Sequence, residues 1–402
     1  MSVVSLAAER ANKLPIYLDN QASTPVDPRV LEAMLPYFTE HFGNPHSESH
    51  VYGSNAMGAI DAARADVAKL IGADPREIIF TSGATEANNL AIKGAAHFAR
   101  AHPPASGERD HIVTLTTEHK CVLESCAALE REGLRVTYLD VEPSGLVALD
   151  KFEAALTDRT LLVSILAAHN EIGVIQPLAE IGALCRSRGI LFHTDAAQAV
   201  GKIPLDVEAM KIDLMSISGH KIYGPKGIGA IYIRRRPRVR LEPLIDGGGQ
   251  ERGVRSGTLP TPLCVGFGRA CAIARDEMAG EAERVRGLRD RLRASILRRV
   301  PDSQVNGDEA HRLPGNINLS FPGVTAPELI EACKPIAIST GSACTSATVE
   351  PSYVLRALGM SDDRANASIR VGIGRFNTAA DIDFAADTLA TAVARLQGAG
   401  QG

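Results

Sequence analysis

The chain has 402 residues, of which 45% are hydrophobic and 22% charged, the composition of an ordinary globular protein and not of a disordered chain. Its 43 basic and 47 acidic side chains give a formal net charge of −4, so the charge balance indicates neither a nucleic acid nor a membrane surface as partner. No apolar run approaches the ~20 residues that span a bilayer. The seven cysteines, an odd number along a long chain, do not indicate a disulfide framework. We therefore expect a protein of the reducing cytoplasm.

Short β-branched segments alternate with helical ones up to about residue 260. Strands are predicted at residues 77–80, 111–115, 135–140, 160–166, 190–195 and 213–218. Helices are predicted over residues 85–100, over a segment that ends near Glu130, and over residues 178–189. Because such alternation is typical of parallel strands joined by covering helices, the sequence predicts an α/β fold with a mostly parallel central sheet.

The composition and pattern of the sequence change from about residue 265. A long charged helical stretch leads there into a region punctuated by proline and glycine. We therefore expect a large domain over residues 27–277 and a smaller α+β domain over residues 1–26 and 278–402.

An anion site is predicted directly after the first of these strands, in TSGATEANN at residues 81–89. Gly83 permits a tight turn, and Thr85 lies where a helix would begin. The unpaired N–H groups and the dipole at a helix N-terminus attract anions. Taken alone, the segment fits an ordinary Ser/Thr helix cap better.

A carboxylate and a lysine follow two later strands. Asp195 ends the strand at 190–195 and is followed by Gln198, and Lys221 comes after the strand at 213–218, beside Ser218 and His220. A carboxylate that leaves a buried strand needs a cationic partner, although capping of the next helix is the commoner use of such an Asp. A lysine desolvated near other cations becomes a good Schiff-base nucleophile. Together with the anion site, these groups fit pyridoxal 5′-phosphate (PLP), which needs a phosphate site, a carboxylate for its ring nitrogen and a lysine for its aldehyde.

Cys344 differs in its surroundings from most other cysteines of the chain. It lies in STGSACTSATVEPS at residues 339–352, a run of small and hydroxylated residues typical of an exposed loop. Free cysteines are usually small buried hydrophobes, and that description suits four others, Cys126, Cys185, Cys264 and Cys271. The sequence therefore favours a reactive thiol at Cys344.

Ordered motifs along nearly the whole chain resemble those of the PLP-dependent cysteine desulfurases, in the class V aminotransferase group of fold-type I. They are YLDNQASTPVDPR (17–29), FGNPHS, FTSGATE, TEHK, NEIG, HTDAAQ, SGHKIYGPKG, GGGQERGVRSGT, GSACTS, EPSYVLRALG and SIRVGIGRF. The GSACTS loop is similar to that of the Isc and Nif types. The resemblance implies a fold-type I transferase that converts L-cysteine to L-alanine and leaves a persulfide on Cys344.

The resemblance also assigns roles to single residues. Lys221 would bond the aldehyde of PLP, Asp195 the ring nitrogen and Gln198 the phenolic oxygen. The phosphate would lie against Ala84, Thr85, Ser218, His220 and, from a second copy in a homodimer, Thr258. His119 would stack on the ring and transfer protons, although a solvated surface position is the commoner fate of a histidine. Asn170 and Arg370 would bind the substrate carboxylate, which a guanidinium can grip through two hydrogen bonds.

The expected partners follow from the same resemblance. A sulfur acceptor, such as an iron–sulfur scaffold protein, would take the persulfide, and Cys344 would then contact the partner's cluster transiently; no resident metal is expected. Two features depart from the family pattern. His169 replaces the first Asn of NNEIG, and the chain ends soon after ARLQ, where Isc-type enzymes often continue with a tail that docks the scaffold.

Three alternatives stay open from the residues. A selenocysteine lyase and an aminotransferase share the fold, although an aminotransferase needs no loop cysteine. A non-catalytic sulfur-relay scaffold would not need the set Lys221, Asp195 and His119.

Overall fold

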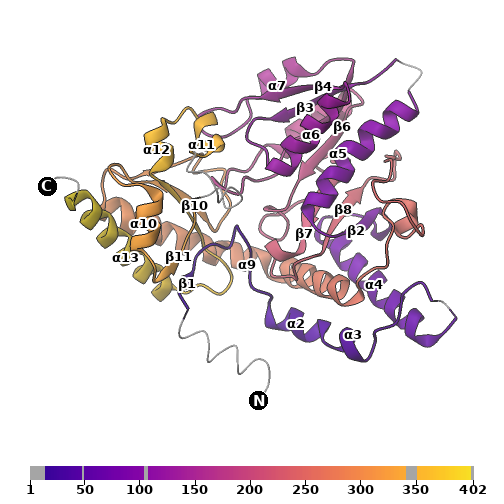
Figure 1. Ribbon diagram of the computed structural model, residues 1–402, viewed down its shortest axis with the longest axis horizontal. Coiled ribbons are helices and arrows are strands. Elements are labelled where there is room, and N and C mark those ends of the chain that lie inside the picture. The colour runs from indigo at the N-terminus through magenta and orange to yellow at the C-terminus, as the bar shows by residue number, and fades with distance from the viewer. Residues whose placement is uncertain (1–13, 48, 104–106, 341–350, 400–402) are drawn as a thin grey trace.

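A seven-stranded sheet forms the centre of the larger part of the molecule (Figure 1). The computed structural model describes residues 14–47, 49–103, 107–340 and 351–399. The strand order is β2-β8-β7-β6-β5-β3-β4, and only β8 runs against the other strands. The strands are β2 (Ile78–Thr81), β3 (His111–Leu115), β4 (Arg135–Leu139), β5 (Thr160–Ser164), β6 (Leu191–Asp195), β7 (Leu214–Ser218) and β8 (Gly229–Ile233). The predicted mostly parallel sheet is thus confirmed, with β8 as a strand that the sequence patterns above do not include.

Helices cover both faces of this sheet because each buried strand presents apolar side chains alternately to its two faces. Ile112 of β3 packs into the core that contains helix α5, whereas its neighbour Val113 packs into the core on the opposite face. The helices of this part are α2 (Pro28–Met34), α3 (Pro36–Thr39), α4 (Val51–Leu70), α5 (Ala84–Ala101), α6 (Lys120–Arg131), α7 (Leu149–Ala155) and α8 (Leu178–Ser187).

A second, smaller core surrounds an antiparallel three-stranded sheet of order β12-β10-β9. Its strands are β9 (Gln304–Val305), β10 (Asn316–Ser320) and β12 (Ser368–Gly372), and β1 (Ile16–Tyr17) pairs beside it with β11 (Ile336–Ala337). Helices α10 (Ala326–Ala332) and α13 (Ala379–Ala399) pack into this core. The short helices α11 (Tyr353–Ala357) and α12 (Asp362–Asn366) instead contribute Val354, Leu355 and Ala365 to the large core. The chain therefore begins and ends its described part in the same region.

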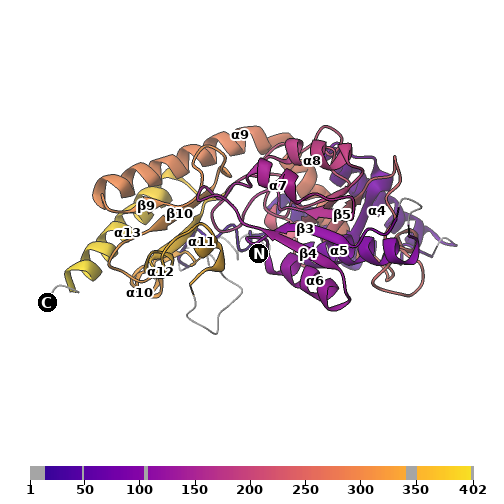
Figure 2. The same cartoon turned by 90° about the horizontal axis from the view of Figure 1, so that it is seen from above.

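The long helix α9 (Thr261–Arg299) connects the two regions (Figure 2). Its first half contributes Cys264 and Phe267 to the large core, and its second half contributes Leu292 and Ile296 to the small one. Because α9 passes residue 278 without a break, the domain limits expected from the sequence stay a prediction. Within the described ranges, no helix is both long and apolar enough to cross a membrane.

Candidate active site

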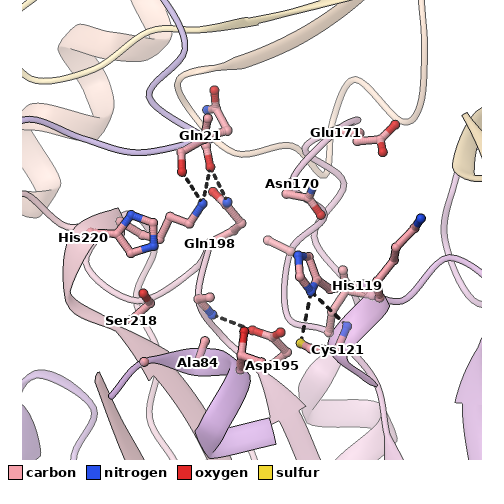
Figure 3. A pocket seen from close by; sticks show the side chains of 18 of the residues that line it. Gln21, Ala84, His119, Cys121, Asn170, Glu171, Asp195, Gln198, Ser218 and His220 are labelled. Carbon is pink, nitrogen blue, oxygen red and sulfur yellow. Dashed lines mark hydrogen bonds between the residues drawn. The ribbon is translucent and has the colours of Figure 1, made fainter. Parts of the chain in front are cut away.

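A cavity of about 490 Å³ opens beyond the carboxyl ends of the central parallel strands, the place where ligands bind in α/β sheets. Ten of the residues proposed from the sequence line it: Ala84, Thr85, His119, Asn170, Asp195, Gln198, Ser218, His220, Lys221 and Arg370. Figure 3 shows most of them converging from opposite sides of the cavity. Two do not: Thr258 is exposed and absent from the lining, and Cys344 lies outside the described residues.

One end of the cavity is formed by the N-terminus of α5. The helix begins at Ala84, and its N-cap is Gly83, with φ 153° and ψ −179°, a conformation that is essentially restricted to glycine. No side chain caps this helix, so the Ser/Thr cap that the sequence also allowed is wrong. The N–H groups of the first turn therefore face the cavity without a side-chain acceptor from the cap, as an anion site requires.

His220 adds a neutral ring to the same end of the cavity. Burial, and then the charges of Lys221 and Lys226, lower the pKa of His220 to about 4. Its Nδ1 lies 3.1 Å from the hydroxyl oxygen of Ser23. His220 is therefore uncharged at neutral pH and can contribute one N–H donor.

Asp195 is a buried carboxylate without a cationic partner in the described part of the chain. Its Oδ2 accepts a hydrogen bond from Asn88 Nδ2 at 2.6 Å, and its Oδ1 accepts one from the Ala197 backbone N–H at 2.9 Å. Asn88 lies fully buried on α5; the motif TSGATEANN contains it, but its role was not predicted. Because buried carboxylates are normally paired with a cation, Asp195 suits a protonated ring nitrogen in the cavity.

Lys221 lies opposite, in the 3₁₀ turn Gly219–Lys221 that follows β7. Its Nζ donates to the backbone carbonyls of Gln21 and Ala22, at 2.6 and 2.7 Å. Gln198 Nε2 donates to the same Gln21 oxygen at 2.8 Å (Figure 3). The segment YLDNQAS thus holds both side chains at the cavity, a function of Gln21 that the sequence did not show.

His119 is the N-cap of α6, and its ring orientation is set by Cys121. The Cys121 backbone N–H donates to His119 Nδ1 at 3.2 Å, and Cys121 Sγ lies 3.0 Å from the same nitrogen. Because a backbone N–H only donates, Nδ1 is an acceptor and the neutral ring carries its hydrogen on Nε2. Burial raises the pKa of the Cys121 thiol to about 12, so this cysteine is not a thiolate at neutral pH.

Arg370 reaches the cavity from the smaller region. This residue of β12 is 1% exposed, and its Nη2 forms an ion pair of 2.6 Å with Asp19 Oδ1. Its Nη1 donates to the Asn170 backbone oxygen at 3.1 Å. Arg370 and Asn170 therefore lie in contact at the cavity. Asp19 lies in a motif quoted above, but its ion pair was not foreseen.

The remaining cysteines that the structure describes are shielded. Cys126, Cys185, Cys264 and Cys271 are buried, as predicted, and Cys333 is buried as well. Among the described residues there is also no group of three or more His, Cys, Asp or Glu side chains that could hold a metal ion.

Comparison with known proteins places the chain in a family. Residues 16–384 match the model of the class V aminotransferases. The human protein "Cysteine desulfurase" is 59% identical over 383 residues, which cover 95% of this chain and 82% of the relative. "Cysteine desulfurase IscS" of Rickettsia typhi is 57% identical over 384 residues, which cover 96% and 92%.

Solved structures agree with this assignment. A "NifS-like protein" superposes with a TM-score of 0.87 at 35% identity, over 95% of this chain and 100% of that one. "SspA in complex with cysteine" superposes with a TM-score of 0.79 at 39% identity, over 90% and 100%. The resemblance seen in the sequence motifs is therefore confirmed, and the chain belongs to the class V aminotransferase family and, within it, to the cysteine desulfurases.

Proposed function

We propose that this chain uses PLP in the cavity to remove the sulfur of L-cysteine, with Cys344 as the thiol that receives it. The products are L-alanine and a Cys344 persulfide, and the reaction needs no outside oxidant. The carbon–sulfur bond of the substrate breaks and a sulfur–sulfur bond to Cys344 forms. Of the two thiol hydrogens, one ends on the methyl group of alanine and the other on the persulfide. The observation that carries the proposal is one cavity that joins Lys221, the cation-free carboxylate of Asp195 and the uncapped N-terminus of α5.

The donor set of this cavity fits PLP. Lys221 is assigned to the aldehyde, Asp195 to the ring nitrogen and Gln198 to the phenolic oxygen. His119 is assigned to the face of the ring. The residues assigned to the phosphate are Ala84, Thr85, Ser218 and His220. When bound, PLP withdraws electrons from the substrate and so makes its carbon–sulfur bond breakable.

The chain's own residues bind the substrate and move its protons. The guanidinium of Arg370 is assigned to the carboxylate of L-cysteine, with Asn170 beside it, and this carboxylate takes the place of Asp19. Lys221 Nζ and the His119 ring are the two basic groups of the lining assigned to proton transfer at the substrate. The curated relatives and a neighbour with bound cysteine support L-cysteine as substrate.

The proposed partners are a second copy of this chain and a sulfur acceptor. Thr258 is exposed and outside the cavity lining, so we assign it to the phosphate site of a partner subunit in a homodimer. An acceptor such as an iron–sulfur scaffold takes the persulfide from Cys344, and this step includes the transient contact of Cys344 with a cluster on that partner.

The test is to incubate the purified, PLP-loaded protein with L-cysteine and to measure alanine, sulfide and protein persulfide together. We expect equal amounts of alanine and released sulfur. Cys344→Ala should still bind PLP and L-cysteine but form no persulfide and little alanine. An aminotransferase would instead convert cysteine to a keto acid, and a relay scaffold would form no alanine.

The matched control is Cys333→Ala, because Cys333 is buried and burial raises its pKa to about 11. This variant should keep its turnover. Mass spectrometry that places the extra sulfur on Cys333 or Cys121, together with an active Cys344→Ala variant, would contradict the assignment of Cys344.

A further inference from the structure

Lys202 is a lysine behind the cavity that the proposed chemistry does not use. It follows β6 by seven residues, its side chain is partly buried, and its Nζ donates to Gln198 Oε1 at 3.0 Å. This is the one hydrogen bond of its ammonium to the described residues. Beside it lies a small cavity of about 30 Å³, which Tyr223 and Glu281 also line.

The two hydrogen bonds of Gln198 determine which way its amide faces. An ammonium group only donates and a backbone carbonyl only accepts. The atom that contacts Lys202 must therefore be Oε1, and the atom that contacts the Gln21 carbonyl, at 2.8 Å, must be Nε2. The orientation of the Gln198 amide thus follows from the chemistry of both partners.

This orientation leaves a donor for the active-site cavity. Nε2 has two hydrogens, and the described residues accept one of them, at Gln21. Gln198 also lines the cavity assigned to PLP. In the opposite orientation Oε1 would meet the phenolic oxygen of the cofactor, and two acceptors in contact repel each other.

We propose that Lys202 is a positioning residue that holds the Gln198 amide with its N–H toward the phenolic oxygen of PLP. The inference rests on the proposed function, because it assumes that PLP occupies the cavity. It also links two lysines: Lys202 bonds Gln198, Gln198 bonds the Gln21 carbonyl, and Lys221 bonds the same carbonyl.

The ionisation of Lys202 does not disturb this arrangement. Burial, followed by the charges of Lys221 and Arg370, lowers the pKa of Lys202 to about 7, although the charge of Glu281 acts in the opposite direction. Below that pH the group is an ammonium, and above it an amine that still carries N–H bonds. Either form can donate to Gln198 Oε1, so the amide keeps its orientation.

The test measures PLP affinity and the absorption spectrum of the bound cofactor. Lys202→Met has a similar length but no donor, so only the Gln21 carbonyl still holds the Gln198 amide, and its Oε1 loses its partner. We expect about three- to tenfold weaker PLP binding, the effect of one weakened hydrogen bond. The spectrum and the pH at which it changes should shift as well. Lys202→Arg keeps a donor and should restore most of both. Lys151→Met, on the exposed surface of α7, is the matched control and should change neither.

A double-mutant cycle separates positioning from a general structural effect. If Lys202 acts through Gln198, Lys202→Met should add nothing to PLP affinity or spectrum in a Gln198→Ala background. Additive effects, or a Lys202→Met protein with wild-type affinity and spectrum, would overturn the inference. Lys202→Leu, which likewise has no donor, carries the same expectation where the Met variant does not fold. A wild-type protein that binds no PLP would contradict the proposed function itself, a different result.

Discussion

The two sides of the active-site cavity are built in different ways. The side with Asp195 and Lys221 comes from strand ends of one sheet, and the groups that hold Asp195 are the adjacent Ala197 N–H and Asn88 of the covering helix. The side with Arg370 joins segments far apart in the chain, since its partner Asp19 lies 351 positions away. The catalytic groups of the first side all come from strand ends of the central sheet, and its covering helix and the segment with Gln21 and Ala22 hold them in place. The second side takes its guanidinium from β12 of the smaller region.

The two sides also differ in how their charges are balanced. In the described structure Asp195 is held by neutral donors and has no cation beside it, so a cationic ring nitrogen can bind without displacing anything. Arg370 already holds a carboxylate, that of Asp19, and an incoming carboxylate must compete with it. On the side assigned to the cofactor, the Asp195 carboxylate is therefore open to a cation. On the side assigned to the substrate, the Asp19 carboxylate occupies the position that the carboxylate of L-cysteine would take.

The strongest test of the cofactor side is Lys221→Ala. The variant removes the only group that we assign to the aldehyde of PLP and one of the two proton carriers. We expect loss of covalent cofactor attachment, seen as loss of the borohydride-reducible absorption band, and a fall in turnover of at least about 10³-fold. A variant that stays covalently loaded and active would mean that another lysine holds the cofactor.

The substrate side should respond in KM, and its two partners should respond in opposite directions. Arg370→Gln removes the charge that binds the substrate carboxylate, so we expect KM for L-cysteine to rise about 10²-fold, with PLP affinity unchanged. Asp19→Asn removes the competing carboxylate and should lower KM by a few-fold. Steady-state kinetics of both variants decides the point: a KM that rises equally in both would show that Asp19 supports Arg370 and does not compete with the substrate.

The same difference explains what could be predicted from the sequence. Asp195 and Lys221 each follow an apolar strand, and parallel strands bring such positions together, so pattern alone identified the cofactor side. Arg370 was found only through the family resemblance, because no local pattern pairs it with Asp19. Strand β8, which begins at Gly229, was missed. Asn88 and Lys202 lacked any local signal, since their roles depend on side chains that only the folded chain brings close.

His169 replaces the first Asn of the family motif NNEIG and precedes Asn170 on the side assigned to the substrate. Its Nδ1 accepts the Glu171 backbone N–H at 3.0 Å, and its Nε2 lies 2.8 Å from the Thr117 carbonyl oxygen. Because a carbonyl only accepts, the hydrogen of the neutral ring is on Nε2. The ring therefore connects the turn before His119 to the turn that holds Asn170, and burial lowers its pKa to about 4.

The smallest expected effect is that of His169→Asn, and its sign depends on pH. The shorter amide can keep the bond from Glu171 but loses the one to Thr117, so at pH 7 we expect the free energy of unfolding to fall by about 1–2 kcal/mol, with little change in kcat.

The unfolded wild-type chain takes up a proton at His169 below its ordinary pKa of 6.5, whereas the folded chain does so only near 4. Wild-type stability therefore falls as the pH drops through this window, by up to about 3 kcal/mol, and the variant lacks that loss. The two stability curves, measured by urea unfolding, should cross between about pH 5 and 6. Parallel curves from pH 7 to pH 4 would mean that His169 is not held neutral in the fold.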